Sequence, residues 1–317
     1  MRRSNPLFLF PGIARILRQG ALLALSGTLL LHAAAVQAQP PLMQAAFTLN
    51  SHNPNELFGN FYYTLGTQLA AQGQLPAAEP MLAKAAHLLP SNPYVRMNDG
   101  IVLEALHRLP EAMARYEEAV QISPKMAQAY YSIGLLQDKQ GQTEAAIVSL
   151  QKALRYTPNH PAINYDLGVF YAKQGNFAQS AVYSKKAVDN DTDFAEAYNN
   201  YGYALAQLGR YTEALEAIKR SLALKPDSAA ALDSKGYAQF GLKQYNEALE
   251  SYNRALKFDP GIGEIYRHIG DVHEKLKQCD PLVKAYQLYL ELTPDATDKT
   301  YIQDKIKQCK RTAINEH

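Results

Sequence analysis

The apolar residues recur with a helical spacing that itself repeats every 34 positions. Within residues 195–228, four apolar or small residues share one face of a helix. These are Tyr198, Tyr201, Gly202 and Leu205. After a turn at residues 208–210, a second stripe runs from Ala214 to Leu222, and Pro226 ends it because the residue before a proline avoids the helical region. Each unit therefore predicts two antiparallel helices joined by a short turn.

Seven glycines in one phase define the unit along the chain. They are Gly66, Gly100, Gly134, Gly168, Gly202, Gly236 and Gly270. A glycine inside a helix costs about 1 kcal/mol relative to alanine. Its recurrence therefore predicts a close approach of the two helices of a unit, with small residues of the second helix facing the glycine. The units run without insertion over residues 59–92, 93–126, 127–160, 161–194, 195–228, 229–262 and 263–296.

Alanine and proline share this period, and the combined pattern resembles the tetratricopeptide repeat family over 238 of the 317 residues. The resemblance implies an all-α, right-handed superhelical solenoid of seven helix-turn-helix hairpins, stabilised by contacts between neighbours. Residues 297–317 follow as a capping helix and tail, with an apolar stripe at Tyr301, Ile302, Lys305, Ile306 and Cys309. The family's aromatic at the fourth repeat position is Tyr62, Tyr130, Tyr198 and Tyr266 here. Arg96, Asn164 and Leu232 replace it in the other repeats, where different packing is expected.

The resemblance also implies a peptide-binding groove on the concave face, lined by the first helix of each pair. Tyrosine offers a broad amphipathic surface, and an asparagine amide both donates to and accepts from an extended backbone. The expected partner is a protein or peptide, neutral or mildly basic because acidic residues outnumber basic ones in the groove. Core packing is the alternative role for each tyrosine, and a solvated surface for Asn98 and Asn200. The candidate groove residues are Tyr63, Asn98, Tyr131, Tyr165, Asn199, Asn200, Tyr203 and Tyr237.

The N-terminus reads as a secretory signal peptide over residues 1–38. It is basic and lacks acids, carries an apolar run over residues 20–31, and ends in Val36-Gln37-Ala38, which predicts cleavage after Ala38. A periplasmic or secreted location in a bacterial envelope follows. The alternative is an uncleaved inner-membrane anchor, although the apolar stretch is short for a span. Residues 39–58, rich in Pro and Asn, are interpreted as a linker, helical near its end.

Charge and cysteine content narrow the function classes. Without the four arginines of residues 1–38, 28 Lys and Arg face 30 Asp and Glu, so nothing in the charge favours nucleic acid. Cys279 and Cys309 cannot form a four-ligand zinc site. In the repeat register Cys279 follows a first helix and Cys309 lies near the end of the next one, so both are expected at the same rim. A disulfide is the hypothesis, and two free thiols are the alternative.

No catalytic motif is present in the sequence. We expect no cofactor, no metal and no small-molecule substrate, and His268 and His273 are interpreted as ordinary surface residues. The expected function is a non-catalytic scaffold that holds a partner segment in the groove. The alternative is a structural subunit of an envelope machine, such as a pilus, polysaccharide-export or cell-wall complex. Such a subunit would dock by its convex face or by self-association, and would touch a membrane only if the N-terminal segment stays attached.

Overall fold

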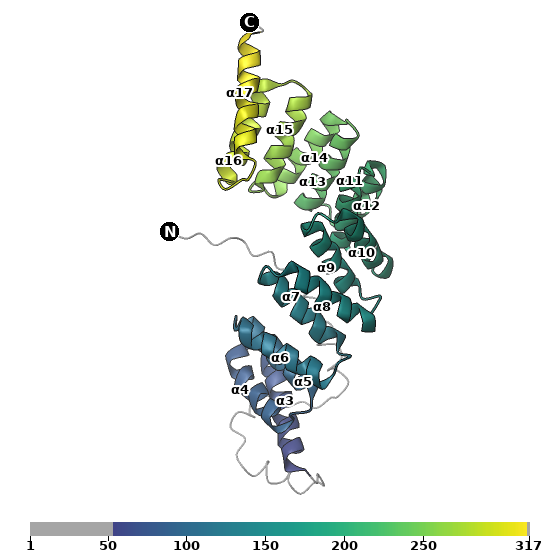
Figure 1. The fold of residues 1–317 in the computed structure, drawn as a ribbon, viewed down its shortest axis with the longest axis vertical. Helices are drawn as coiled ribbons and strands as arrows, with labels where there is room; N and C mark the ends of the chain where they lie inside the picture. Colours follow the sequence, from purple (N-terminus) through teal and green to yellow (C-terminus); the bar gives the residue numbers. More distant parts are fainter. Residues whose placement is uncertain (1–52, 316–317) are drawn as a thin grey trace. The chain divides into compact units, whose positions relative to one another are not determined.

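The computed structural model describes residues 53–315, which fold into α-helices without strands (Figure 1). The predicted signal peptide and linker residues 39–52 lie outside the described residues. The first described helix already begins at Pro54, within the predicted linker. Two compact units divide between Tyr156 and Thr157. The first contains α3 (Pro54–Ala71), α4 (Leu75–Leu88), α5 (Pro93–Ala105), α6 (Leu109–Ile122), α7 (Ala127–Lys139) and α8 (Thr143–Tyr156).

The second unit contains the later helices, again as antiparallel pairs. Its members are α9 (Pro161–Lys173), α10 (Phe177–Asn190), α11 (Ala195–Gln207), α12 (Tyr211–Leu224), α13 (Ala229–Gly241), α14 (Tyr245–Phe258), α15 (Gly263–Lys275), α16 (Cys279–Leu292) and α17 (Lys299–Asn315). From α5 onward, each first helix starts at the first residue of a 34-residue unit. Repeat positions below are counted from that residue. The all-α solenoid of helical hairpins expected from the sequence is therefore the observed fold.

Helix ends follow local chemistry. Asn53 and Asn92 cap α3 and α5, their side chains accepting from the backbone N–H two residues later, and proline stands at the first helical position. The turn between the two helices of each pair needs a left-handed residue at position 15. Four pairs supply glycine there, whereas His107, Lys243 and Lys277 adopt φ values of 60°, 62° and 57°. These three residues adopt a left-handed backbone conformation, which glycine adopts at a lower cost in free energy.

The sequence led us to expect small residues of the second helix opposite the mid-helix glycines, and the structure places the residue at position 24 there. It is small beside Gly168, where an added Cβ would stand 2.3 Å from Ser184 Oγ. In the other repeats it is large: a Cβ on Gly236 would stand 2.5 Å from the Tyr252 ring, and one on Gly202 would stand 2.5 Å from Ile218. The close backbone approach is nevertheless present, because the same Gly202 Cβ would lie 3.0 Å from the carbonyl oxygen of Ala214.

The fourth repeat position shows how the unusual residues are accommodated. In two repeats with tyrosine there, a lysine at position 26 covers the ring, with Lys84 Nζ 5.2 Å from the centre of the Tyr62 ring and Lys152 Nζ 5.7 Å from that of Tyr130. In the second repeat Arg96 replaces the ring, and its Nε lies 2.9 Å from Glu118, which stands at position 26. Asn164 is fully buried and donates to the carbonyl oxygens of Pro158 and His160. The expected difference in packing is thus an exchange of cation–ring contacts for ion pairs or backbone hydrogen bonds.

The C-terminal helix α17 covers the last hairpin. Ile302 is fully buried against Leu282, Tyr286 and Tyr289, and Ile306 packs beside it. The apolar stripe of α17 is narrower in the structure than the sequence predicted. Tyr301 is exposed, and Lys305 forms an ion pair with Glu274 instead.

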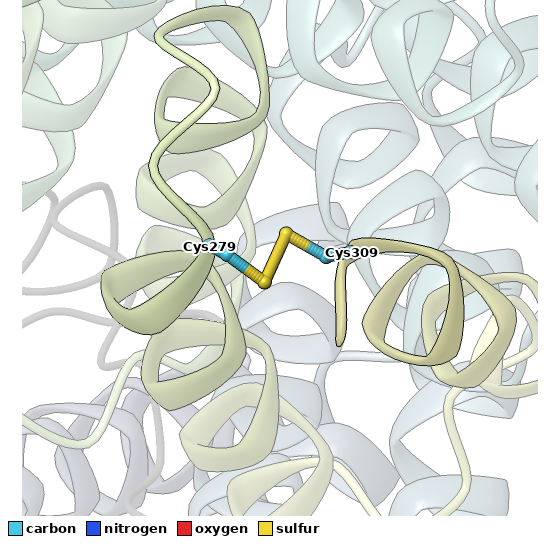
Figure 2. The surroundings of a disulfide bond; sticks show 2 residues. All are labelled: Cys279 and Cys309. Carbon is cyan, nitrogen blue, oxygen red and sulfur yellow. A yellow bond between two sulfur atoms is a disulfide. The ribbon is translucent and has the colours of Figure 1, made fainter. Parts of the chain in front are cut away.

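Figure 2 shows the two cysteines facing each other across the start of α16 and the side of α17. The structure joins Cys279 and Cys309 by a disulfide, with their Cα atoms 5.5 Å apart. That separation suits a disulfide. The bond therefore ties α17 to the first turn of α16.

No helix among the described residues is both long and apolar enough to span a bilayer.

Candidate functional site

The first helices of the second unit form a continuous inner wall, because α9 contacts α11, α11 contacts α13 and α13 contacts α15. Tyr203 and Tyr237 stand at position 9 of α11 and α13 and are half-buried, so each presents part of its ring to solvent. Tyr237 Oη donates to Gln207 Oε1 over 3.4 Å, and the Tyr203 ring meets the edge of Phe177. We call Tyr203, Gln207 and Tyr237 the tyrosine wall.

Burial is the largest cause of the raised pKa of both tyrosines, and neighbouring Asp233 adds to it at Tyr203. Both phenols stay protonated at neutral pH. Because Tyr237 donates its O–H to Gln207, its oxygen can accept a hydrogen bond from a peptide N–H. A half-buried ring with a free edge is a suitable anchor for an extended peptide. Among the predicted groove residues of the second unit, these two tyrosines share one repeat position, have a fixed geometry and keep part of the ring accessible.

A histidine–aspartate pair borders the tyrosine wall. His268 Nδ1 lies 2.9 Å from Asp233 Oδ1, and the His268 ring packs against those of Tyr237 and Tyr252. Burial alone would lower the pKa of His268, but the hydrogen bond and charge of Asp233 raise it above its ordinary value. The interpretation of His268 as an ordinary surface residue is therefore wrong, since it joins two neighbouring repeats.

Position 6 serves to join repeats rather than to face a ligand. Asn200 Nδ2 donates to Ser184 Oγ over 2.6 Å, and that serine stands at position 24 of the preceding repeat. His268 meets Tyr252 at the same place two pairs further on. Asn200, expected in the groove or on a solvated surface, is thus occupied between helices. Its neighbour Asn199 keeps a buried side-chain oxygen that has no hydrogen-bond partner in the described residues.

The remaining predicted groove residue of the second unit is Tyr165 on α9. Its ring packs against Phe194 with centres 4.8 Å apart. Burial is the largest cause of the raised pKa of its phenol. Tyr165 is therefore more a packing residue than an open anchor.

The first unit brings two predicted residues together. Asn98 Nδ2 donates to Tyr63 Oη over 2.7 Å, which joins α5 to α3. Tyr131, in contrast, is only 2% exposed, so the expectation that it faces a groove is wrong. Burial of the Tyr131 ring inside the unit stabilises the fold more than exposure to water would.

Gln207 was missed by the sequence reasoning, which named only tyrosines and asparagines as groove candidates. Glu104, counted among the acidic groove residues, accepts from Tyr116 Oη and pairs with Lys139 Nζ at 2.5 Å. Arg267 pairs with Asp298 through Nε at 2.8 Å. In each pair the acidic side chain is bound to a basic one of the same unit.

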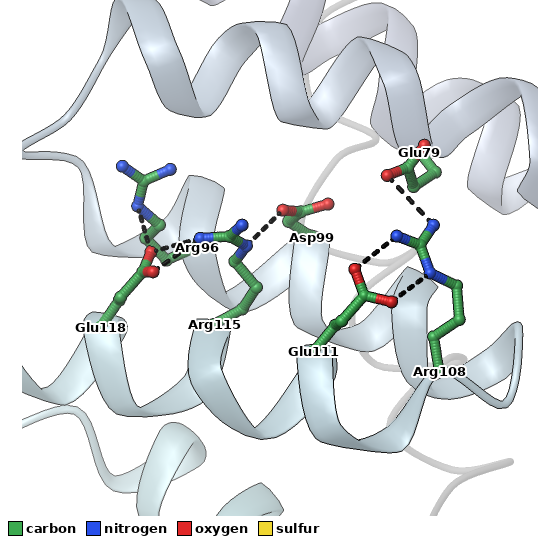
Figure 3. Close-up of polar contacts among 7 residues, drawn as sticks. All are labelled: Glu79, Arg96, Asp99, Arg108, Glu111, Arg115 and Glu118. Atoms are coloured by element: carbon green, nitrogen blue, oxygen red, sulfur yellow. Dashed lines mark hydrogen bonds and ion pairs between the residues drawn. The ribbon is translucent and has the colours of Figure 1, made fainter.

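Figure 3 shows a second polar cluster, in the first unit, that no motif announced. Asp99 on α5 is 2% exposed and lies 3.1 Å from Arg115 Nε through one carboxylate oxygen. Its other oxygen has no hydrogen-bond partner in the described residues. Burial is the largest cause that raises the pKa of Asp99 to about 6, against the opposing charge of Arg115. Arg108 bridges Glu79 and Glu111 on the neighbouring surface.

Family profiles match the chain over much of its length. The tetratricopeptide repeat profiles cover residues 60–84, 105–141, 139–175 and 193–261. Together with the observed helical hairpins, these matches show that the chain belongs to the tetratricopeptide repeat family. No curated protein matches the chain in sequence comparison.

Solved structures with the same fold include YrrB, described as a TPR protein with an unusual peptide-binding site. It is 24% identical with a TM-score of 0.52, covering 56% of this chain and 92% of YrrB. A tetratricopeptide repeat protein from Parabacteroides merdae is 16% identical with a TM-score of 0.57, covering 80% and 99%. PilW, described as a widely conserved type IV pilus biogenesis factor, is 18% identical with a TM-score of 0.57, covering 67% and 98%. These likenesses show the fold.

Proposed function

We propose that this chain is an exported, non-catalytic scaffold that holds an extended segment of a partner protein along the first helices of its second unit. The observation that carries the proposal is the tyrosine wall. Tyr203 and Tyr237 repeat at one position on adjacent helices and are fixed by Gln207 and Phe177, yet each keeps part of its ring accessible. Rigid aromatic anchors of this kind carry much of the energy in protein interfaces.

The wall also favours a ligand backbone over a defined side-chain sequence. The N–H groups of the Gln207 amide can donate to a peptide carbonyl, and the phenol oxygens can accept from a peptide N–H. The Asp233 carboxylate lies beside this surface, with its Oδ1 2.9 Å from His268 Nδ1. A neutral or mildly basic segment therefore suits this surface best. The description of YrrB as a peptide-binding protein supports the mode of binding but says nothing of the partner here.

The double variant Tyr203→Ala/Tyr237→Ala is expected to weaken peptide binding on the order of a hundredfold, because two interface anchors are removed. Peptides selected from a random displayed library on the unmodified protein serve as the probe, and affinity is measured by calorimetry. Circular dichroism checks that the fold is kept.

Tyr183→Ala/Tyr301→Ala is the matched control, since these two tyrosines lie on α10 and α17 outside the wall. The control should bind like the unmodified protein. Equal affinity of the Tyr203→Ala/Tyr237→Ala variant and the unmodified protein would contradict the proposed site. A loss of peptide affinity in the control variant alone would also contradict the proposed site. It would show that the peptide binds elsewhere than on the first helices.

Export is the part of the proposal that rests on sequence. The basic and apolar residues 1–38 end in a cleavage pattern, and the disulfide between Cys279 and Cys309 suits an oxidising compartment. The mature protein from the native envelope is expected to begin near Gln39 in N-terminal sequencing. A protein that retains Met1 and fractionates with the inner membrane would instead support the anchored alternative.

The alternative function is a structural subunit that docks by its second helices. Phe258 on α14 and Val182 on α10 are about half exposed and support it. Single exposed apolar residues are nevertheless common on soluble proteins. The likeness to PilW, a pilus biogenesis factor by description, is a likeness of fold and does not favour one envelope machine. The tyrosine wall therefore remains the stronger basis.

A further inference from the structure

The Asp233 carboxylate lies on α13 beside the tyrosine wall. Asp233 and Tyr237 stand at positions 5 and 9 of this helix, one turn apart on the same face. Burial is the largest cause of the raised pKa of Tyr203 on the neighbouring helix α11, and the charge of Asp233 adds to it. The Asp233 side chain is 24% exposed, so a group bound on the wall can approach it. The carboxylate therefore acts on both rings of the wall.

His268 on α15 is the hydrogen-bond partner of Asp233 within the described residues. Its Nδ1 lies 2.9 Å from Asp233 Oδ1. Because a carboxylate can only accept, Nδ1 carries the proton of this bond in both charge states of the imidazole. The charge state is decided at the other ring nitrogen, Nε2. The pair is therefore neutral when Nε2 is protonated and carries one negative charge when it is not.

Two aromatic rings hold the imidazole beside Asp233. The centre of the His268 ring lies 5.9 Å from that of Tyr237 on α13 and 5.5 Å from that of Tyr252 on α14. These contacts leave the His268 side chain 18% exposed. A change in the charge of His268 therefore takes place directly against a ring of the wall and does not require the imidazole to move.

The other charged groups of α15 near the pair have partners of their own. Arg267 pairs with Asp271 on the same helix at 3.5 Å and with Asp298, just before α17, at 2.8 Å. Asp271 also accepts from Tyr286 Oη of α16 over 2.8 Å. Glu264 is exposed at the start of α15 and adds a negative charge near the wall. Carboxylates and guanidinium groups ordinarily keep one charge around neutral pH, so none of these groups changes the balance there.

His268 is the group of this surface that changes charge near neutral pH. Burial alone would lower the pKa of His268, but the hydrogen bond and charge of Asp233 raise it, with Asp271 adding to the rise and Arg267 opposing it. The imidazole therefore loses its second proton above its ordinary value of 6.5. The negative charge of Asp233 is uncompensated on the alkaline side of this change.

We propose that the tyrosine wall binds a lysine or arginine side chain of the partner segment, that Asp233 selects this side chain, and that protonation of His268 weakens its binding. The inference rests on the proposed function, because it concerns the same wall. A cation is attracted to the face of a tyrosine ring, and a carboxylate beside the ring adds an ion pair. When His268 is protonated, its charge already compensates Asp233, and the partner's cation loses that interaction.

Peptide selection at two pH values tests the proposal. A random displayed library without histidine, selected on the full chain at about pH 8.5, is expected to enrich lysine or arginine at one position. Selection at about pH 5.5 should lose that enrichment. A peptide selected at the higher pH and its copy with norleucine at that position are then compared by calorimetry. The basic peptide should bind on the order of tenfold more weakly at the lower pH, whereas the norleucine peptide should change little.

Three variants assign the effect to the pair. His268→Asn keeps an N–H donor near the place of Nδ1 but cannot gain a proton, so it should bind the basic peptide tightly at both pH values. Asp233→Asn should bind it on the order of tenfold more weakly at the higher pH and lose the pH dependence. His273→Asn is the matched control on α15, since His273 bonds to Gln278 and not to an acid, and it should behave like the unmodified protein.

The outcomes separate this inference from the proposed function. A basic peptide that depends on Tyr203 and Tyr237 but binds equally at both pH values would overturn the inference alone. So would a pH dependence that persists in His268→Asn, or a selection at the higher pH that enriches no basic residue. Selected peptides that keep their affinity in Tyr203→Ala/Tyr237→Ala would contradict the proposed function, and the inference with it.

Discussion

Replacing both cysteines with serine is expected to destabilise the C-terminal hairpin and α17 by about 3.5 kcal/mol. The disulfide closes a loop with a sequence separation of 30, and the chain-entropy model assigns a constraint of about this size to such a loop. The effect should be local, because each repeat in a solenoid contacts only its neighbours. Hydrogen exchange of α16 and α17 measures it, and amides there should exchange on the order of a hundredfold faster or more in Cys279→Ser/Cys309→Ser.

The control for this experiment is the unmodified protein treated with reductant, which should reproduce the exchange of the double variant. Amides of α9 and α10, several repeats away, should stay unchanged in both. Thiol titration in denaturant establishes the starting state. Two reactive thiols before any reductant is added would contradict the disulfide, and unchanged exchange in α17 would show that Ile302 and Ile306 hold the helix without it.

The sequence predicts the fold well because the repeat fixes it many times over. A residue such as Gly202 has one role in each hairpin, and seven copies in one phase leave a single period. From α5 onward the first helices begin where that period places them. What the period does not give is which side chain fills the space beside the glycine. That depends on distances between helices, and the structure assigns the space to the residue at position 24, which ranges from Ser184 to Tyr252.

The candidate site was predicted less completely, for a related reason. Residues at positions 5 and 6 lie on the border between the inner wall and the contact with the preceding repeat. Small differences in helix rotation decide whether a residue at these positions faces solvent or packs against the preceding repeat. Tyr131 is buried and Asn200 is engaged by Ser184, whereas Tyr203 and Tyr237 at position 9 keep accessible rings. The sequence also gave no reason to expect two compact units from an uninterrupted period.

Asp99 illustrates a residue whose importance only the structure shows. It occupies position 7, where Ile133 and Leu167 supply buried apolar side chains in the next two repeats. Its neighbour Arg115 contacts one carboxylate oxygen but also forms two hydrogen bonds to Glu118. A buried ion pair with incomplete hydrogen bonding rarely recovers the cost of removing the charges from water. The ionised carboxylate is therefore expected to reduce the stability of the first unit.

Asp99→Leu is expected to stabilise the first unit at neutral pH by on the order of 2–3 kcal/mol. The pKa of Asp99 rises from 3.8 to about 6 on folding. Each unit of difference between the folded and unfolded pKa is worth about 1.4 kcal/mol once the group is ionised. Leucine also matches the apolar residues at the same position in neighbouring repeats. Urea unfolding followed by circular dichroism, together with hydrogen exchange in α5, measures the gain.

The pH dependence separates the buried charge from general packing effects. The folded state binds a proton at Asp99 that the unfolded state has already lost, so the stabilising contribution of the protonated carboxyl is present at about pH 4 and is lost as the pH rises through about 6. Asp99→Asn removes the charge while keeping the shape, and serves as the matched variant. Its stability relative to the unmodified protein should increase across that interval and level off above it. A difference that stays constant with pH would show that the Asp99 carboxyl ionises in the folded chain as it does in water.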